Sequence, residues 1–276
     1  MLSQLFSDVA SLWAKYRMVY LTGIANTLIL ATTATLIGCV IGFLCGILQT
    51  IPNGSKDHIL KRILLKILRI IIRAYVEIFR GTPMILQAVF IYYGLPYFFG
   101  VSFKDIWTVS ILVVSINTGA YMAESVRGGI ISIDPGQFEG AKAIGMNHWQ
   151  TMLYIILPQT LRNIMPQIGN NYIINVKDTS VMFIIGFSDF FAVHKMVSGA
   201  VFKYFPSAFM EMGGYLCLTL LASFMLRRLE KKLAGKSNYE LVNTDQLVMT
   251  AGTYNYPKEA GSPFDEKNRE YKGGEQ

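Results

Sequence analysis

The chain has 276 residues, of which 52% are apolar and 16% are charged, and its formal net charge is +7. Soluble domains carry about 25% charged residues, so this composition excludes an ordinary soluble protein. The high apolar content also excludes disorder over most of the chain. A disulfide scaffold is excluded as well, because the only cysteines, Cys39, Cys45 and Cys217, all lie in apolar runs.

The first apolar run covers residues 22–48, which exceeds the about 20 residues that a helix needs to cross a membrane. It is too long for a signal peptide, and no cleavage pattern of small residues accompanies it. This run therefore predicts the first span, with residues 1–19 outside the cytoplasm. Gly38, Gly42 and Gly46 form a stripe of small residues in this run, which predicts close contact with another helix.

Residues 59–79 are expected to form a helix that lies at the membrane surface or is partly immersed. Their charges recur at steps of three or four residues, which places them on one helical face. Each charge at mid-membrane would cost about 2.5–3.5 kcal/mol, so a further span is disfavoured here. The charged positions are Arg62, Lys66, Arg69, Arg73, Glu77 and Arg80.

Four more apolar runs predict spans at residues 83–99, 106–123, 169–191 and 205–226. Lys177 and Asp178 interrupt the third of these runs, and the last one contains Glu211. The predicted fold is therefore all-α: a polytopic membrane protein with five transmembrane helices.

Basic residues cluster after the first, third and fifth predicted spans, as at Lys61, Arg127 and Arg227. Basic loops stay in the cytoplasm, so the N-terminus is expected outside and the C-terminus inside. Residues 20–234 then form the transmembrane domain, and residues 235–276 a flexible cytoplasmic tail whose regulatory role stays open. Because topology accounts for the net charge, a nucleic-acid partner is not expected.

Motifs for catalysis or metal binding are not found in the sequence. The histidines at 58, 148 and 194 lie far apart and lack ligands at metal-binding spacing. Gly235-Lys236-Ser237 resembles the end of a phosphate-binding loop, but Glu230 stands where that loop needs a glycine. We therefore expect no metal, no cofactor, no catalytic residues and no ATPase motif in this chain.

The loop at residues 133–167, between the third and fourth predicted spans, is too structured for a simple connector. Asp134 is a good N-cap and Pro135 a good first helical residue. Gly145 is suited to end that helix, and Asn147 to cap the next one. The loop is therefore expected to form a rigid protrusion of two short helices, with Pro158 and Pro166 setting the return path.

Within this loop, Glu139-Gly140-Ala141, Gly145 and Leu157-Pro158 resemble the EAA loop of permease subunits in ATP-binding-cassette importers. Gly140 departs from the usual alanine, while the spacing is kept. The resemblance implies a type I importer-like fold in which this coupling loop seats on an ATPase. Glu139 would contact the ATPase or cap its own helix, Ala141 would allow close approach, and Gly145 would set the angle between the two helices.

Three further stretches resemble the branch of this family that takes up polar amino acids. They are Phe79-Arg80-Gly81-Thr82-Pro83 with Tyr92-Tyr93-Gly94-Leu95-Pro96, the residues 117–129, and Lys177-Asp178-Thr179-Ser180. The resemblance implies a multi-pass protein of a prokaryotic inner or plasma membrane that carries a polar amino acid. Its implied partners are a second permease (identical or related), two cytoplasmic ATPases that bind the ATP, an external solute-binding protein and membrane lipid.

Hydrophilic residues inside the predicted spans are candidates for the substrate path, because polar groups in a membrane usually face a cavity or the bundle interior. Glu124 and Lys177 would supply the acceptor and the donor that a zwitterionic amino acid needs. Two alternatives stay open: Lys177 pairs with Asp178 or Glu124 to hold helices together, or these groups lie near the cytoplasmic end. The candidates are Asn117, Glu124, Asn171, Asn175, Lys177 and Asp178.

Other classes of membrane protein stay open at this point. An ion-coupled secondary transporter would usually carry an inverted repeat, which this sequence does not show. A permease for another small polar solute fits the same pattern. A receptor or scaffold would leave the structured loop without a role.

Overall fold

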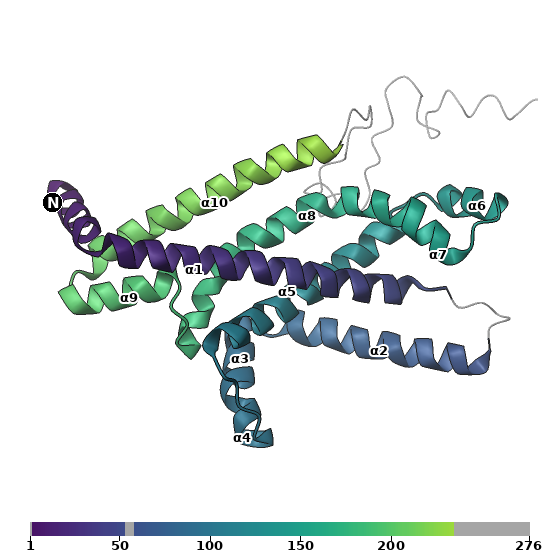
Figure 1. The fold of residues 1–276 in the computed structure, drawn as a ribbon, viewed down its shortest axis with the longest axis horizontal. Coiled ribbons are helices and arrows are strands. Elements are labelled where there is room, and N and C mark those ends of the chain that lie inside the picture. The colour runs from purple at the N-terminus through teal and green to yellow at the C-terminus, as the bar shows by residue number, and fades with distance from the viewer. Residues whose placement is uncertain (1, 53–57, 235–276) are drawn as a thin grey trace, which may run out of the picture. The chain divides into compact units, whose positions relative to one another are not determined.

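The computed structural model describes residues 2–52 and 58–234, so the tail predicted at 235–276 lies outside the described residues. The regular structure of these residues is helical, without a strand among them. The helices (Figure 1) are α1 (Leu2–Thr50), α2 (Ile59–Gly81), α3 (Met84–Val89), the π-helical turn η1 (Phe90–Gly94), α4 (Leu95–Phe99), α5 (Ile106–Ile131), α6 (Pro135–Ala143), α7 (His148–Thr151), the π-helical turn η2 (Met152–Ile156), α8 (Leu157–Asp178), the 3₁₀ helix η3 (Thr179–Ile185), α9 (Phe190–Val201) and α10 (Tyr204–Ala234).

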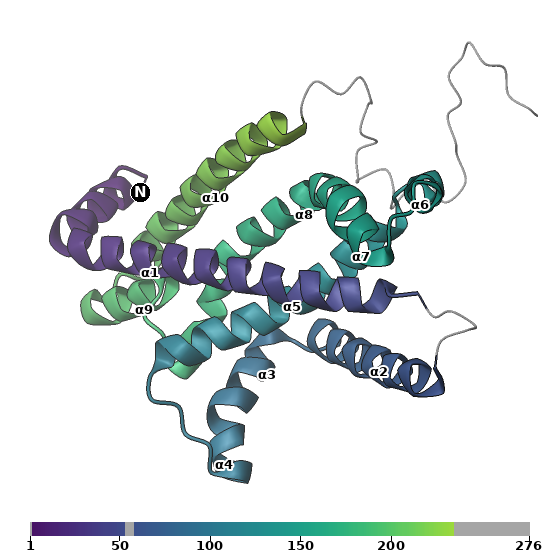
Figure 2. The ribbon, with the colours of Figure 1, turned by 45° about the vertical axis from the view of Figure 1, so that its right-hand side comes forward.

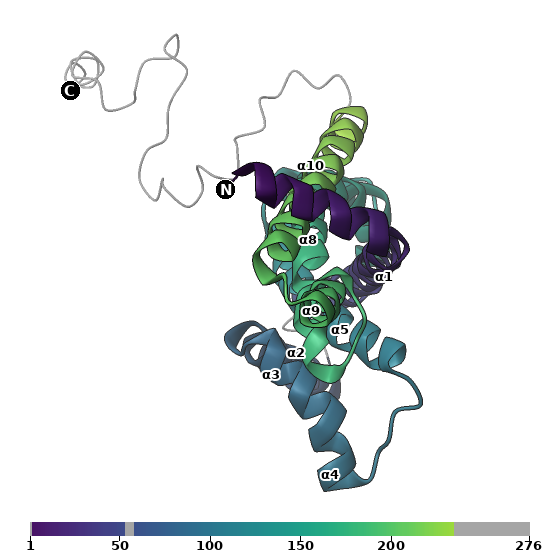
Figure 3. The same ribbon diagram turned by 90° about the vertical axis from the view of Figure 1, so that its left-hand side faces the viewer.

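Helix α1 packs closely on α5 along its glycine stripe, which confirms the predicted contact. A Cβ atom at Gly38 would lie 2.6 Å from Cβ of Thr118, and one at Gly46 would lie 2.6 Å from Cγ1 of Val126. Real carbon atoms do not approach so closely, so only glycine permits this backbone contact. The N-terminal part of α1, including most of residues 1–19, continues the same helix and packs against α9 and α10 (Figure 3).

Helix α2 has the predicted amphipathic character and lies against α5. It buries Leu65, Ile72 and Val76 while its charged side lies elsewhere, and the Tyr75 hydroxyl donates to the carbonyl of Ile116 at 2.6 Å. The helix ends at Gly81, and α3 leaves in a different direction, as Figure 2 shows. Its place relative to the membrane stays a prediction.

Both π-helical turns precede a leucine–proline pair. The N–H of Leu95 donates to Phe90 in η1, and the N–H of Leu157 donates to Met152 in η2, each across five residues. Proline at the next position has no N–H and its ring clashes with the carbonyl four residues earlier. Widening the preceding turn relieves that clash and keeps the helix continuous.

The predicted number of five spans is not confirmed. Among the described residues, α1, α5 and α10 are each long and apolar enough to cross a membrane, and α8–η3 with α9 would form a fourth span bent by 54°. The second predicted span is the shorter apolar stretch Met84–Phe99. The run predicted at 169–191 is not one helix of its own. Its first part, to Ile185, is the end of a helix that begins at His148, and Lys177 and Asp178 fall where the α-helix changes to a 3₁₀ helix. Residues 186–189 then separate it from α9.

Candidate functional site

The first short helix of the predicted coupling loop, α6, begins and ends at the predicted residues. Asp134 caps it by accepting from the N–H of Gly136 at 2.7 Å, with Pro135 at the first position. At the other end Gly145 has a φ of +79°, and its N–H donates to Lys142 while that of Met146 donates to Ala141, both at 3.0 Å. This pair of bonds is a Schellman motif, which needs a left-handed residue at Gly145.

The second helix starts as predicted but does not end within the loop. Asn147 and Gln150 form a capping box, in which each side chain accepts from the other residue's backbone N–H. From His148 the chain stays helical through α7, η2 and α8 to Asp178. The expectation of two separate short helices is therefore wrong, because the π-helical turn lets the helix pass through Leu157-Pro158 and Pro166 lies inside α8.

Buried apolar side chains join this loop to the long helices. Met152 and Ile156 pack with Met122, Val126 and Ile130 of α5 in one cluster. The half-buried Leu157 borders the same cluster, and Pro158 beside it is exposed. A displacement of the loop would therefore be transmitted to α5 and α8, since a close-packed cluster moves as a unit.

The outer side of the loop is open. Glu139, Gly140 and Gly145 are exposed, whereas Ala141 is buried. Large apolar side chains are also exposed here, which is unusual for a protein surface unless a partner covers them. These are Ile144 (77% exposed), Trp149 (58%), Leu153 (56%) and Tyr154 (74%).

A charged cavity of about 880 Å³ lies between the end of α1, α2, α5 and α6. Glu124 and Arg127, two of its lining residues, form an ion pair one turn apart on α5. Arg80 lies close by, with its guanidinium 5.4 Å from the ring centre of Tyr121 and its charge within reach of Glu124. The other charged lining residues are Arg69, Arg73, Glu77, Glu139 and Lys142.

Asn175 and Asn171 are buried between helices instead of lining this cavity. The Asn175 amide donates to Oγ1 of Thr35 at 2.7 Å and to Oγ1 of Thr118 at 2.9 Å, so it connects α8 to α1 and α5. Asn171 donates to Sδ of Met122 and to the carbonyl of Gln167. Both side chains therefore have packing partners in this chain.

Asn117 and the pair Lys177–Asp178 occupy other places. Asn117 is half-buried on α5 and its amide donates to Gln87. Lys177 is exposed and Asp178 half-buried at the end of α8. Glu124 and Lys177 do not lie close together in the structure. Among the described residues, 2–52 and 58–234, the cations near Glu124 are Arg127 and Arg80. The six candidates thus do not form one site within the chain.

Comparison with known proteins settles the family. The model of the binding-protein-dependent transport system inner membrane component matches residues 38–235. The chain belongs to this family. The glutamine transport system permease protein GlnP of Escherichia coli strain K12 is 32% identical to this permease over 226 residues, which is 82% of this chain and 97% of that protein.

Solved structures agree with this assignment. A crystal structure of an amino acid ABC transporter with histidines is 31% identical, with a TM-score of 0.69 over 79% of this permease and 96% of that chain. The inward-facing MetNI methionine ABC transporter is 19% identical with a TM-score of 0.65, over 79% of this chain and 98% of that one, and supports the fold alone. The predicted all-α, type I importer-like permease fold and multi-pass inner-membrane location are confirmed, and an ion-coupled transporter finds no support.

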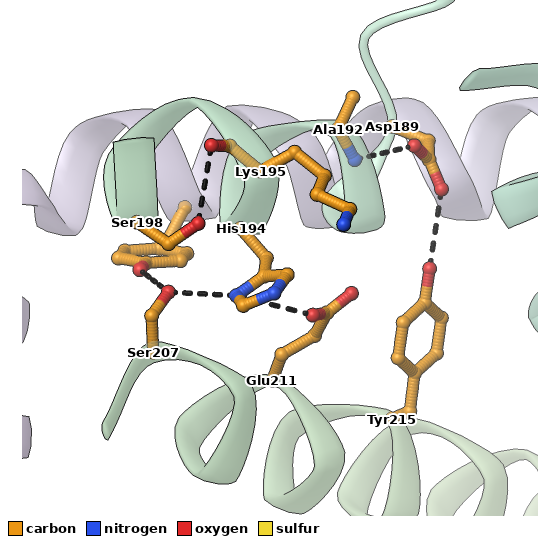
Figure 4. A network of polar contacts seen from close by, with 9 residues as sticks. Asp189, Ala192, His194, Lys195, Ser198, Ser207, Glu211 and Tyr215 are labelled. Carbon is orange, nitrogen blue, oxygen red and sulfur yellow. Dashed lines mark hydrogen bonds and ion pairs between the residues drawn. The ribbon is translucent and has the colours of Figure 1, made fainter. Parts of the chain in front are cut away.

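One polar cluster of the permease was missed by the sequence analysis. It joins α1, α9 and α10 and includes Asp189, His194, Ser207 and Glu211, each less than 7% exposed (Figure 4). The sequence analysis noted Glu211 only as an acid inside an apolar run, and His194 only as an isolated histidine. The other members are scattered over the chain, so their proximity depends on how the helices pack.

Proposed function

We propose that this permease is the membrane subunit of an ATP-driven importer of polar amino acids. It pairs with a second permease, identical or related, and works with two cytoplasmic ATPases and an external solute-binding protein. The N-terminus lies outside the cell and the C-terminus in the cytoplasm. The chain itself hydrolyses no ATP, and its partners bind the nucleotide. The similarity to the glutamine permease and to the amino acid ABC transporter supports the substrate class.

The observation that carries this proposal is the construction of the coupling loop. Backbone caps at both ends of α6 fix its shape, and the cluster around Met152 and Ile156 joins it to α5 and α8. The exposed side chains of Ile144, Trp149 and Tyr154 offer the apolar surface that docking on an ATPase requires. Closure of the ATPases on ATP would move this loop as a lever and shift the bundle between inward-open and outward-open states.

For the substrate path we place Arg80, rather than Lys177, opposite Glu124. Asn117, Tyr121 and Glu124 follow one another at helical spacing on one face of α5, where Tyr121 is 40% exposed. Polar side chains on the outer face of a membrane helix are costly unless they face water or another chain. The substrate carboxylate would meet Arg80, and its ammonium group would meet Glu124, which lines the charged cavity.

Reconstitution of the complete transporter tests this function. Uptake of labelled glutamine into proteoliposomes is expected to require ATP on the ATPase side and binding protein on the other. Ile144→Glu is expected to lose the ATPases on co-purification, whereas Leu229→Glu, exposed on α10 beyond the predicted span at 205–226, tests for a general effect of the charge. Uptake driven by an ion gradient without ATP would overturn the proposal.

A further inference from the structure

The junction of α1, α9 and α10 holds two buried carboxyl groups in different surroundings (Figure 4). Asp189 is fully satisfied. It caps α9 by accepting from the N–H of Ala192 at 2.9 Å, and it accepts from the Tyr215 hydroxyl at 3.1 Å. The start of a helix also favours a negative charge, so Asp189 is suited to remain an anion.

Glu211 lacks such partners. Its Oε1 atom is buried and has no hydrogen-bond partner in the part of the chain that the structure describes, while its Oε2 atom lies 3.6 Å from Nδ1 of His194. The same Nδ1 atom lies 2.9 Å from the hydroxyl of Ser207, which lies 2.9 Å from the hydroxyl of Tyr20. A chain of polar groups thus runs from α1 to Glu211 and ends on a carboxyl group that lacks a donor.

The charges around Glu211 do not balance two carboxylates. From α9 it faces Asp189, His194 and Lys195, and from α1 and α10 it faces the uncharged Tyr20 and Tyr215. Lys195 is the one cation among them, and its ammonium group is exposed and lies over the rings of Phe191 and Tyr204. The nearby Lys203 is already paired with Asp8 at 2.6 Å.

We propose that His194 and Glu211 form a proton-binding site that locks α9 against α10. The pair holds one proton more than a neutral imidazole and a carboxylate, and the imidazole or the carboxyl group carries that proton, with Nδ1 and Oε2 lying 3.6 Å apart. Loss of this proton leaves the Glu211 carboxylate buried beside Asp189 without a hydrogen-bond donor. The unpaired buried charge favours separation of α9 from α10. The contact between α9 and α10 therefore weakens as the pH rises on the side of the membrane where α9 lies. This effect does not depend on which solute the permease carries.

Cysteine labelling on α9 tests this lock in the full chain, in a background with Cys39, Cys45 and Cys217 replaced by alanine. Ser198→Cys, one turn from His194 and 6% exposed, reports opening, and Ala200→Cys, exposed on the same helix, corrects for thiol ionisation. Because the closed state binds one more proton, the corrected labelling rate should rise by up to about tenfold per pH unit in part of the range from about pH 5 to 8.

Two variants decide the outcome. Glu211→Gln keeps the shape without the carboxylate and should abolish the rise of the corrected rate with pH, whereas Glu230→Gln, on the same helix outside the cluster, should keep the wild-type slope. If Glu211→Gln does not fold, His194→Gln should shift the midpoint of the profile. A wild-type rate that does not change with pH, a wild-type slope in Glu211→Gln, or an unshifted midpoint in His194→Gln would overturn the proposal.

Discussion

The Asn117 amide on α5 donates to Oε1 of Gln87 on α3 at 3.0 Å. Gln87 in turn donates to the carbonyls of Phe79 and Thr82, each at 2.9 Å. These carbonyls lose their helical partners where α2 ends before Pro83. The Asn117 amide also donates to the Phe79 carbonyl, at 3.1 Å. Gln87 and Asn117 together therefore satisfy the end of α2 and hold the bend between α2 and α3, the elbow, against α5.

Removal of the Gln87 amide should weaken the elbow. Gln87→Leu would leave Asn117 and the Phe79 carbonyl without this partner, at an expected cost of about 1–3 kcal/mol in unfolding free energy. Thermal unfolding in detergent measures the loss. Gln137→Leu, at an exposed position on α6, serves as the control. Equal melting temperatures of the two variants would show that the elbow does not depend on Gln87.

The coupling loop should respond oppositely to substitutions at Gly145 and at Gly140. Gly145→Val puts a β-branched residue at a φ of +79°, which costs about 1–3 kcal/mol and should lower transport by displacing the end of α6. Gly140→Ala adds a methyl group that meets no atom within 4 Å, so it should keep transport and stabilise α6 by about 0.5–1 kcal/mol. Measurement of ATP-dependent uptake and melting temperature compares the two variants directly. Full uptake by Gly145→Val would contradict the proposal that the coupling loop acts as a rigid lever.

Asn175 should act on stability and not on substrate affinity. Asn175→Val removes the bonds that connect α8 to Thr35 and Thr118, and the expected loss is about 1–3 kcal/mol. Variants that assemble should keep the wild-type KM for uptake. A raised KM with an unchanged melting temperature would instead place Asn175 on the substrate path.

Arg80 should matter for the substrate carboxylate. Arg80→Ala is expected to reduce uptake of an amino acid at least about tenfold, the loss that corresponds to one hydrogen-bonded charge pair, with assembly unchanged. Tyr121→Phe keeps the aromatic face under Arg80 and should transport almost normally. Equal uptake by Arg80→Ala and the wild type would remove Arg80 from the path.

The sequence predicts local structure well in this protein because local rules decide it. The caps at Asp134 and Asn147, the left-handed Gly145 and the glycine stripe of α1 all follow from short-range geometry. Continuity through Leu157-Pro158 was missed, since proline usually ends a helix and only a widened turn avoids that.

Contacts between residues far apart in the sequence were much harder to predict from the sequence. Glu124 and Lys177 seemed complementary by charge, but α5 and α8 place them apart, and Arg80 comes close to Glu124 through the packing of α2 on α5. The cluster of His194 and Glu211 likewise depends on three helices whose mutual placement no local pattern specifies.

The glycine contact between α1 and α5 limits how the transporter is able to change shape. Two helices whose backbones are in such close contact cannot slide or rotate against each other without a clash. The hydrogen bonds of Asn175 connect α8 to the same two helices. These three helices therefore travel together in the transport cycle. Hinges belong at the margins of this block, at the bend after Gly81 and at the turn that precedes α9.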